Sequence, residues 1–177
     1  YLFEDVPALN PRANLAEPEV NLVGVDPVRQ ARAGGLRDLA GNSVDLAALG
    51  PNDALVSEAA AKKLDAVPGD TLTVHAHDRP HELRVVAIVR NEAATGVFAF
   101  GFGQDGGGIA VPLETAQRIV GRPGQISWLS VALRGDPRDP NDTDDAAAKR
   151  LQDYLRTDAG RADLGTTHLQ IRVETIK

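Results

Sequence analysis

The sequence predicts an α+β domain with a mixed β-sheet core and short helices. Residues 71–77 alternate apolar and polar side chains, which is the period of a strand with one buried face. Residues 82–89 carry apolar side chains on both faces from Val85 onward, as expected of a central strand covered on both sides. A short helix is predicted just before them, over residues 58–64, because Ser57 can cap its first turn.

The first two dozen residues contain Pro7, Pro11 and Pro18, which favour an extended segment crossing a surface over a helix. The apolar residues 20–25 then predict a strand. Asp26 followed by a proline predicts the start of a helix, which the glycines at 34, 35 and 41 limit to a few turns.

In the middle of the chain, residues 54–56 predict a short strand before the helix at 58–64. A turn follows at residues 68–69, and a hairpin turn is predicted at residues 78–80. After a glycine-rich stretch that ends at Gly108, residues 109–111 predict a strand. Pro112 then begins a helix over residues 113–120, which Gly121 ends.

The last third of the chain has a β-α-β pattern. A strand is predicted at residues 126–133, an acidic loop at 136–145 and a final strand around residues 169–173. The helix between them has an apolar stripe of Ala147, Leu151, Tyr154 and Leu155. We therefore expect one domain over residues 1–177 with two subdomains: a β-rich part at 40–125, and a β-α-β unit at 126–177 on which the N-terminal segment packs.

The predicted buried core has two parts. One contains Leu72, Val74, Val85 and Ile88; the other contains Leu151, Leu155, Ile171 and Val173.

Composition narrows the class of protein. The chain has 177 residues, 42% of them hydrophobic and 25% charged, which is typical of a globular domain. Its net charge of -6 and the lack of a basic run argue against nucleic acid as a partner. Residues 93–104, the longest stretch without a charge, are fewer than the roughly 20 apolar residues that span a bilayer. Because the chain contains no methionine and begins Tyr-Leu-Phe, we expect it to be part of a longer protein.

The candidate metal ligands are His75, His77 and His81, with Asp78 beside them. A His-x-His pair on a strand places both imidazoles on one face, as a zinc site needs. The spacing departs from the His-x-His-x-Asp-His pattern of metallo-β-lactamases, and only His168 lies elsewhere in the chain. The two strand histidines also alternate with apolar residues, which favours a solvent-facing position. We therefore predict no bound metal.

Two further motifs lack the context that their chemistry requires. Residues 101–106 match G-x-G-x-x-G, but a strand follows them where a dinucleotide site needs a helix, so no cofactor is predicted. The serines at 43, 57, 127 and 130 lie outside any G-x-S-x-G turn, and Ser57 is explained as a helix cap. We find no catalytic centre and predict that the domain is not an enzyme.

Phe98, Phe100 and Phe102 are three of the four phenylalanines, and they alternate with small residues. In a strand they would share one face. They either belong to a core strand or form an aromatic ridge on a glycine-flanked loop, where they would contact a partner protein or an apolar substrate. We take them as the candidate contact site.

An ordered set of segments resembles the extracytoplasmic domain of FtsX/MacB-like ABC transporter permeases. In order along the chain they are residues 23–27 (VGVDP), 39–41 (LAG), 53–64 (DALVSEAAAKKL), 68–74 (PGDTLTV), 84–89 (RVVAIV) and 109–112 (IAVP). The likeness covers roughly residues 20–177. It departs from the family at the N-terminus, where a first β-α-β unit is not evident.

The resemblance implies a domain on the outer face of the cell membrane, between the first two transmembrane helices of a permease. Its partners would be a cytoplasmic ATP-binding subunit, reached through those helices, and an extracytoplasmic protein or apolar substrate. Such domains bind and transmit motion without catalysis. Two alternatives stay open: a soluble module that binds a small molecule or glycan in a concave pocket, and a zinc-dependent hydrolase that uses His75 and His77.

Overall fold

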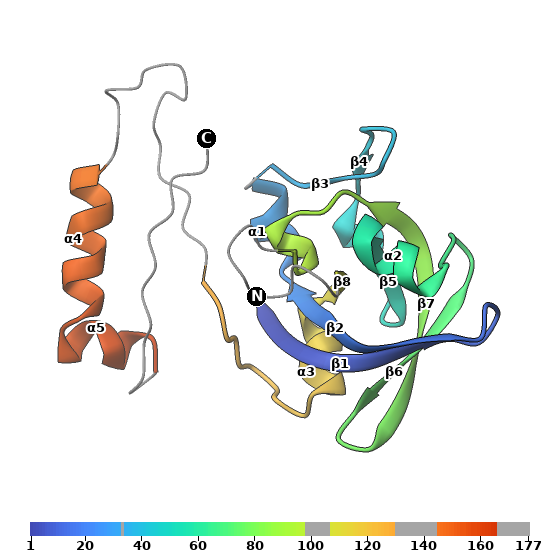
Figure 1. Ribbon diagram of the computed structural model, residues 1–177. Coiled ribbons are helices and arrows are strands. Elements are labelled where there is room, and N and C mark those ends of the chain that lie inside the picture. The colour runs from blue at the N-terminus through green and yellow to red at the C-terminus, as the bar shows by residue number, and fades with distance from the viewer. Residues whose placement is uncertain (33, 98–106, 130–144, 166–177) are drawn as a thin grey trace. The chain divides into compact units, whose positions relative to one another are not determined.

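The computed structural model describes residues 1–32, 34–97, 107–129 and 145–165 (Figure 1). The chain divides into two compact units, Tyr1–Ser130 and Val131–Lys177.

Six of the described strands of the first unit close into a barrel in the order β1-β2-β8-β5-β7-β6 (Figure 1). They are β1 (Leu2–Asn10), β2 (Leu15–Val25), β5 (Asp53–Ser57), β6 (Thr71–Ala76), β7 (Arg79–Val89) and β8 (Gly108–Pro112). The pairs β2–β8 and β5–β7 are parallel, and the other neighbours are antiparallel. A mixed sheet with short helices confirms the predicted α+β class.

Short elements surround the barrel. The helices are α1 (Pro27–Arg32), α2 (Glu58–Leu64) and α3 (Leu113–Ile119), and single 3-10 turns form η1 (Leu46–Ala48) and η2 (Ala93–Thr95). A small antiparallel pair, β3 (Leu36–Arg37) and β4 (Ser43–Val44), lies between α1 and η1 in sequence. The second unit contains α4 (Asp145–Leu155) and α5 (Asp158–Asp163).

The N-terminal segment is extended, as predicted, but it is part of the barrel. β1 and β2 form a long hairpin, and β1 also pairs with β6 through Ala8 and Val74. The register of the hairpin shifts between Val6 and Ala8. Pro7 lies at this bulge, where a residue without an N–H group is tolerated. The first 25 residues therefore belong to the first unit, together with residues 40–125.

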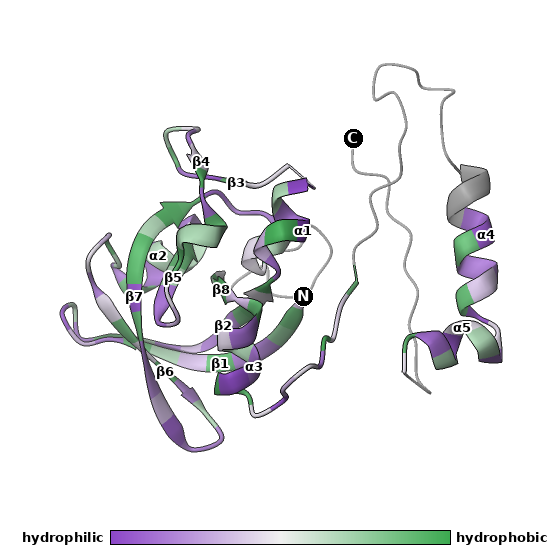
Figure 2. Cartoon of the chain, turned by 180° about the vertical axis from the view of Figure 1, so that it is seen from behind, coloured by the Kyte–Doolittle hydropathy of each residue, from purple (hydrophilic) through white to green (hydrophobic). Residues whose placement is uncertain are grey.

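Two apolar clusters stabilise the first unit. The first fills the barrel and includes Leu22, Val56, Leu72, Val74, Val85 and Ile109, with α2 and α3 packed against it. The second lies on the opposite face of β2, β5, β7 and β8 and includes Val23, Leu36, Leu46, Leu55, Val89 and Ala110. Figure 2 shows these strands as largely hydrophobic and the tip of the β6–β7 hairpin as hydrophilic.

Most of the predicted core of the first unit is buried. Leu72, Val74 and Val85 are at most 1% exposed, whereas Ile88 is half-buried. β7 pairs with strands on both sides, as predicted for residues 82–89, but Val86 is 40% exposed.

Two predicted elements differ from the structure. β6 ends at Ala76, and the hairpin turn is formed by His77 and Asp78, which both have positive φ angles of 49° and 59°. Residues 126–129 form no strand, where one was predicted over 126–133. The N–H groups of Ser127 and Trp128 both donate to the carbonyl of Tyr1, which an extended ladder does not allow.

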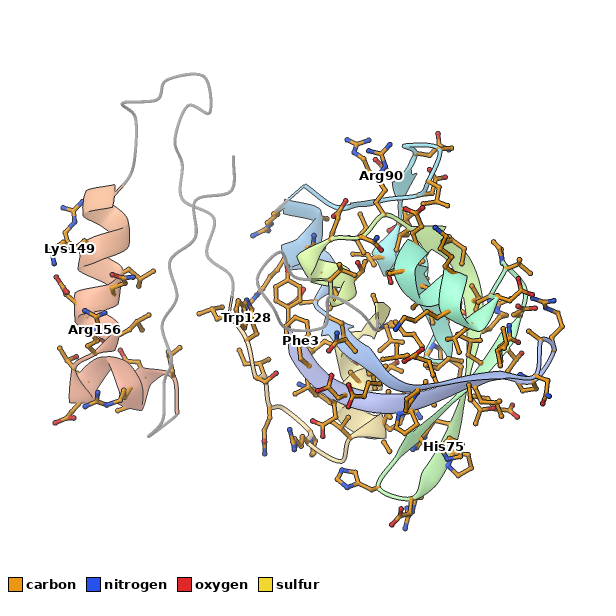
Figure 3. All side chains as sticks on the ribbon, viewed as in Figure 1. Phe3, His75, Arg90, Trp128, Lys149 and Arg156 are labelled. Carbon is orange, nitrogen blue, oxygen red and sulfur yellow. The ribbon has the colours of Figure 1, made fainter. Side chains whose placement is uncertain are left out.

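The second unit contains the predicted helix as α4. Leu151 and Leu155 are half-buried and Tyr154 is 46% exposed, so the apolar stripe is less buried than predicted. Lys149 pairs with Asp153 on α4 at 3.3 Å; Figure 3 labels Lys149 on this helix and Arg156 just after its end. Ile171 and Val173 lie outside the described residues.

A buried carboxylate joins the tip of the β1–β2 hairpin to the turn before β6. Asp70 accepts hydrogen bonds from Nδ2 of Asn10 at 3.1 Å, Nε of Arg12 at 2.7 Å and the N–H of Val67 at 3.0 Å. Burial alone would raise the pKa of Asp70, but these hydrogen bonds and the charge of Arg12 hold it below its usual value.

Asp70 should therefore make the domain sensitive to acid. Because the pKa of Asp70 is lower in the folded chain than in the unfolded chain, its stabilisation is present above about pH 4 and is lost as the pH falls further. We expect Asp70→Asn to be less stable than the unsubstituted chain at pH 7, with a difference that shrinks below about pH 4. Urea unfolding at a series of pH values measures this.

The matched control is Asp5→Asn, because Asp5 is exposed on β1. This variant should follow the pH dependence of the unsubstituted chain. A constant difference between Asp70→Asn and the unsubstituted chain from pH 7 to pH 3 would contradict the assignment.

Candidate functional site

The outer face of the barrel is covered by α1, the β3–β4 pair, η1 and η2. Their buried residues Leu36, Leu46 and Ala94 pack on the same cluster as Val23 of β2 and Val89 of β7. The cover is held to the barrel through an isolated bridge between Asp38 and Val89. The candidate site includes this cover, because the cover contains an apolar cavity and, at η2, one end of the segment that carries the three phenylalanines.

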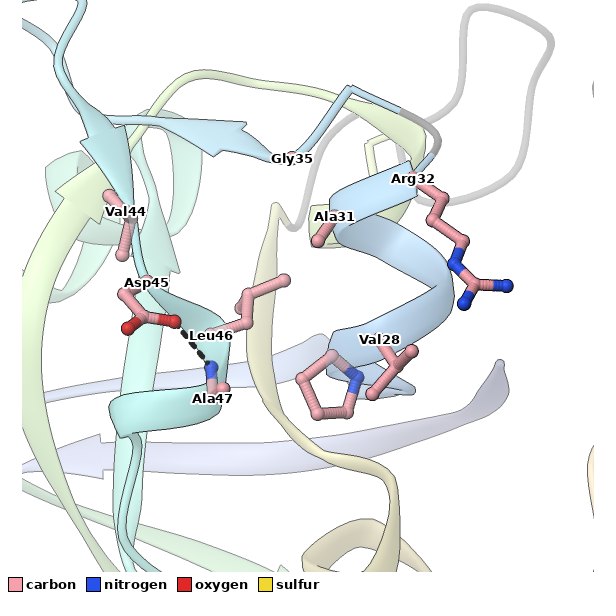
Figure 4. Close-up of a pocket in the computed structure, with 9 residues that line it drawn as sticks. Val28, Ala31, Arg32, Gly35, Val44, Asp45, Leu46 and Ala47 are labelled. Atoms are coloured by element: carbon pink, nitrogen blue, oxygen red, sulfur yellow. Dashed lines mark hydrogen bonds between the residues drawn. The ribbon is translucent and has the colours of Figure 1, made fainter.

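The cavity lies between α1 and η1 and has a volume of about 390 Å³ (Figure 4). Its lining is mainly apolar and includes Pro27, Val28, Ala31, Val44 and Leu46. Two charged residues also line it, Arg32 on α1 and Asp45 before η1, and they lie on opposite sides in Figure 4. A cavity of this composition suits an apolar group with a small polar end.

Local signals explain both walls of the cavity. Asp26 caps α1 as predicted: its Oδ1 atom accepts the N–H groups of Val28 and Arg29, both at 3.0 Å. Asp45 caps η1 in the same way, and its Oδ1 accepts the N–H of Ala47 at 2.9 Å. Short polar caps therefore fix the directions of the two helical turns.

An aromatic cluster of Tyr1, Phe3 and Trp128 borders α1. The rings of Tyr1 and Phe3 stack at 5.8 Å, and Trp128 meets Phe3 edge-on at 6.1 Å (Figure 3). The Tyr1 hydroxyl donates to Gln30 of α1. Burial raises the pKa of this hydroxyl, and the negative charge of Glu92 raises it further.

Both ends of the segment at residues 98–106 are held by buried side chains. Asn21 of β2 donates from Nδ2 to the carbonyl of Gly96 at 2.8 Å, and its backbone N–H donates to the carbonyl of Gly107 at 3.1 Å. Ser57 accepts the N–H of Gly108 at 2.8 Å and that of Ala60 at 3.2 Å. The predicted cap on α2 is thus confirmed, and the same hydroxyl also holds the start of β8.

Glycine is required where the segment returns to the barrel. A Cβ on Gly108 would lie 1.9 Å from the carbonyl oxygen of Thr95, and one on Gly107 would lie 2.3 Å from the backbone nitrogen of Ala60. Thr95 is itself fixed, because its hydroxyl accepts the N–H of Glu92 at 3.0 Å. We call Asn21, Ser57, Thr95, Gly107 and Gly108 the loop clamp.

Phe98, Phe100 and Phe102 lie outside the described residues, as does the G-x-G-x-x-G match at 101–106. Their assignment as a contact site stays a prediction. The structure describes the loop clamp on either side of them.

The three candidate histidines differ in position and in exposure. His75 is exposed on β6, whereas His77 lies in the turn and its Nε2 contacts the carbonyl of Val120 at 3.0 Å. His81 lies on β7 opposite Val74 and is half-buried. In the part of the chain that the structure describes, no three His, Cys, Asp or Glu side chains converge to hold a metal ion.

The cavity, the aromatic cluster and the loop clamp were not predicted. Tyr1 and Phe3 alternate around the buried Leu2, which is a strand pattern, but it does not indicate the contact with a residue 125 positions later. The apolar pattern of residues 20–25 predicts a strand and does not single out Asn21. A single amide buried in such a strand nevertheless indicates a polar contact.

Among the described helices, none is both long and apolar enough to cross a membrane. No curated protein matches the chain. It is similar to the crystal structure of a domain of a protein assigned as a permease from Porphyromonas gingivalis, with 16% sequence identity and a TM-score of 0.46. That match covers 99% of this chain and 74% of the other.

The model of the MacB-like periplasmic core domain family matches residues 4–154, which is most of the chain. This match confirms the resemblance to FtsX/MacB-like ABC transporter permeases. It also implies a position outside the cytoplasmic membrane. The chain belongs to the MacB-like periplasmic core domain family.

Proposed function

We propose that this domain binds an extracytoplasmic partner protein or an apolar substrate for an ABC transporter permease. In this proposal the domain itself catalyses nothing. The rest of the permease couples its movement to ATP hydrolysis by a cytoplasmic subunit. Membership of the family supports the extracytoplasmic position, and the outer cover of the barrel supports the contact.

The observation that carries the proposal is the loop clamp. A contact loop is most effective when its ends are fixed, because less conformational entropy is then lost on binding. Asn21 holds the chain before residue 98 and again after residue 106, through Gly96 and Gly107. In this proposal the barrel holds both ends of the segment that carries Phe98, Phe100 and Phe102, and these residues make the contact.

The apolar cavity provides a second surface in the same cover. One wall of the cavity, η1, packs through Leu46 on the cluster that also contains Ala94 of η2, and α1 forms the wall that faces η1. In this proposal an apolar side chain or substrate group enters the cavity beside Val28 and Leu46, while the phenylalanines contact the same ligand.

Replacing Phe98, Phe100 and Phe102 together with serine should abolish transport or partner binding by the intact permease. Large apolar rings supply most of the binding energy at such surfaces, whereas serine retains almost none of it. The unfolding midpoint of the domain should change little. Transport or co-purification assays with the intact permease measure the first effect, and thermal unfolding measures the second.

The control is the double variant Val67→Ser and Val86→Ser, which removes two exposed apolar side chains outside the cover. It should retain transport. If the triple phenylalanine variant unfolds the domain, the rings belong to a core and the contact site lies elsewhere.

A further inference from the structure

A second, polar groove lies beside the first residues of β7, which extend beyond the pairing of β7 with β5. β7 begins at Arg79, but its pairing with β5 begins only at Arg84, opposite Asp53. Before that point β7 faces the last turn of α3 across a groove of about 280 Å³. Asn52, His81, Glu82, Arg118 and Ile119 are among its lining residues.

Arg118 is held in place at this groove. Its Nη2 donates to the carbonyl of Pro51 at 2.8 Å and to Oδ1 of Asn52 at 3.2 Å, so the guanidinium is fixed by neutral acceptors. Among the described residues, no ion pair involves Arg118, Arg79 or His81. A fixed guanidinium without a carboxylate partner can bind an oxyanion without first breaking an ion pair.

His81 lies beside cationic groups in this groove. Its half-buried imidazole has a pKa below the usual value, because burial disfavours the charged form and because Arg118, Arg79 and His75 all repel a proton there. Glu82 is the one acidic residue among the described residues that line the groove. Arg118, which lines the groove, and Arg79, which acts on His81 from the start of β7, together outnumber this one carboxylate.

We propose that the groove between β7 and α3 binds the phosphate group of a small anionic ligand, with Arg118 and His81 as its contacts. A phosphate dianion fits better than a single carboxylate, because Arg118 and Arg79 are both cationic and a dianion would also favour protonation of His81. The groove is also larger than the phosphate group alone. This site is independent of the proposed contact loop and of the apolar cavity.

The site should respond to pH through its histidines. A bound dianion favours protonated His81, so binding and protonation should strengthen each other. His75 and Arg79 face His81 from β6 and β7, Arg118 faces it from α3, and Glu82 opposes them on β7. His77 and Asp78 lie in the adjoining hairpin turn. Binding should therefore tighten as the pH falls from 8 to 6.

Calorimetric titration of the chain with sulfate, inorganic phosphate and glycerol 3-phosphate tests the proposal. Sodium chloride at equal ionic strength is the reference for screening. Sulfate keeps two charges throughout this pH range, so any tightening with falling pH reports protonation of the protein. Binding of inorganic phosphate alone would identify a free ion as the ligand, and binding of glycerol 3-phosphate as well would identify a phosphate ester.

Arg118→Gln and His81→Gln should each weaken binding, and Arg118→Gln by at least roughly tenfold, as expected for loss of a charge-assisted hydrogen bond. Arg150→Gln is the control, because Arg150 is exposed on α4. In the unsubstituted chain, saturating sulfate should raise the pKa of His81, which NMR follows directly. Arg118 is exposed, so its replacement should leave the fold intact, and thermal unfolding checks this.

The proposal is overturned if none of the three anions binds beyond the sodium chloride reference. It is equally overturned if folded Arg118→Gln and His81→Gln bind as tightly as Arg150→Gln, or if sulfate leaves the pKa of His81 unchanged.

Discussion

Replacing Gly108 with alanine should destabilise the first unit by about 3 kcal/mol or more, at the upper end of what overpacking costs. The added Cβ would lie 1.9 Å from the carbonyl oxygen of Thr95 and 3.1 Å from that of Asn21. Both are backbone atoms, so no side chain can rotate away to make room. The strands β2 and β8 or the turn at η2 would have to move apart.

The movement would also break polar contacts of the loop clamp. Gly108 donates its N–H to the buried hydroxyl of Ser57 at 2.8 Å, and losing this hydrogen bond would leave the buried N–H unpaired. The free energy of unfolding, measured in urea, reports the total cost. The effect should be largest in hydrogen exchange at the start of β8 and at η2.

Gly50→Ala is the matched control for this substitution. A Cβ there would meet the carboxylate of Asp53 at 3.2 Å, which is the end of a flexible side chain. Its cost should be well below that of Gly108→Ala. Equal costs would mean that the segments around Thr95 yield readily, and the rigid base proposed for the contact loop would then be lost.

The elements that could be predicted from the sequence are those with local signals. Ser57 caps α2, the alternation of residues 71–76 forms β6, and a proline begins α3 after β8, all within a few residues of the signal. The hairpin of β6 and β7 follows from the same kind of evidence. The α+β class rests on these elements.

The parts of the fold and of the candidate site that could not be predicted depend on contacts between residues far apart in the sequence. β2 pairs in parallel with β8, so Asn21 meets Gly108, and no local pattern indicates this partner. The prolines at 7, 11 and 18 predict an extended segment that crosses a surface, and they give no sign that it pairs into the barrel, because the bulge that accommodates Pro7 forms only in the hairpin. The apolar cavity likewise needs α1 and η1 to meet, and the groove at β7 exists because β5 starts late.

Replacing Leu72 with alanine should have the second large effect, a loss of about 2 to 5 kcal/mol in the free energy of unfolding. Leu72 on β6 is fully buried in the barrel with Val74, Leu83 and Val85. β6 is paired with β7 on one side and with β1 on the other, so the surrounding backbone can collapse only slightly into the space that the side chain leaves. The free energy of unfolding should therefore fall by most of the energy that an unfilled cavity costs.

Two leucines that are less buried serve as controls for this substitution. Leu39→Ala removes a side chain that is 50% exposed in the first unit, and Leu155→Ala removes a half-buried one from α4 of the second unit. Each should cost about 1 kcal/mol or less, because only part of the side chain leaves water on folding. Urea unfolding gives the free energies, and hydrogen exchange on β6 and on α4 assigns each loss to its own unit. If Leu72→Ala cost no more than Leu39→Ala, the barrel interior would be loosely packed, and a barrel that yields so easily could not serve as the fixed base from which the loop clamp presents residues 98–106.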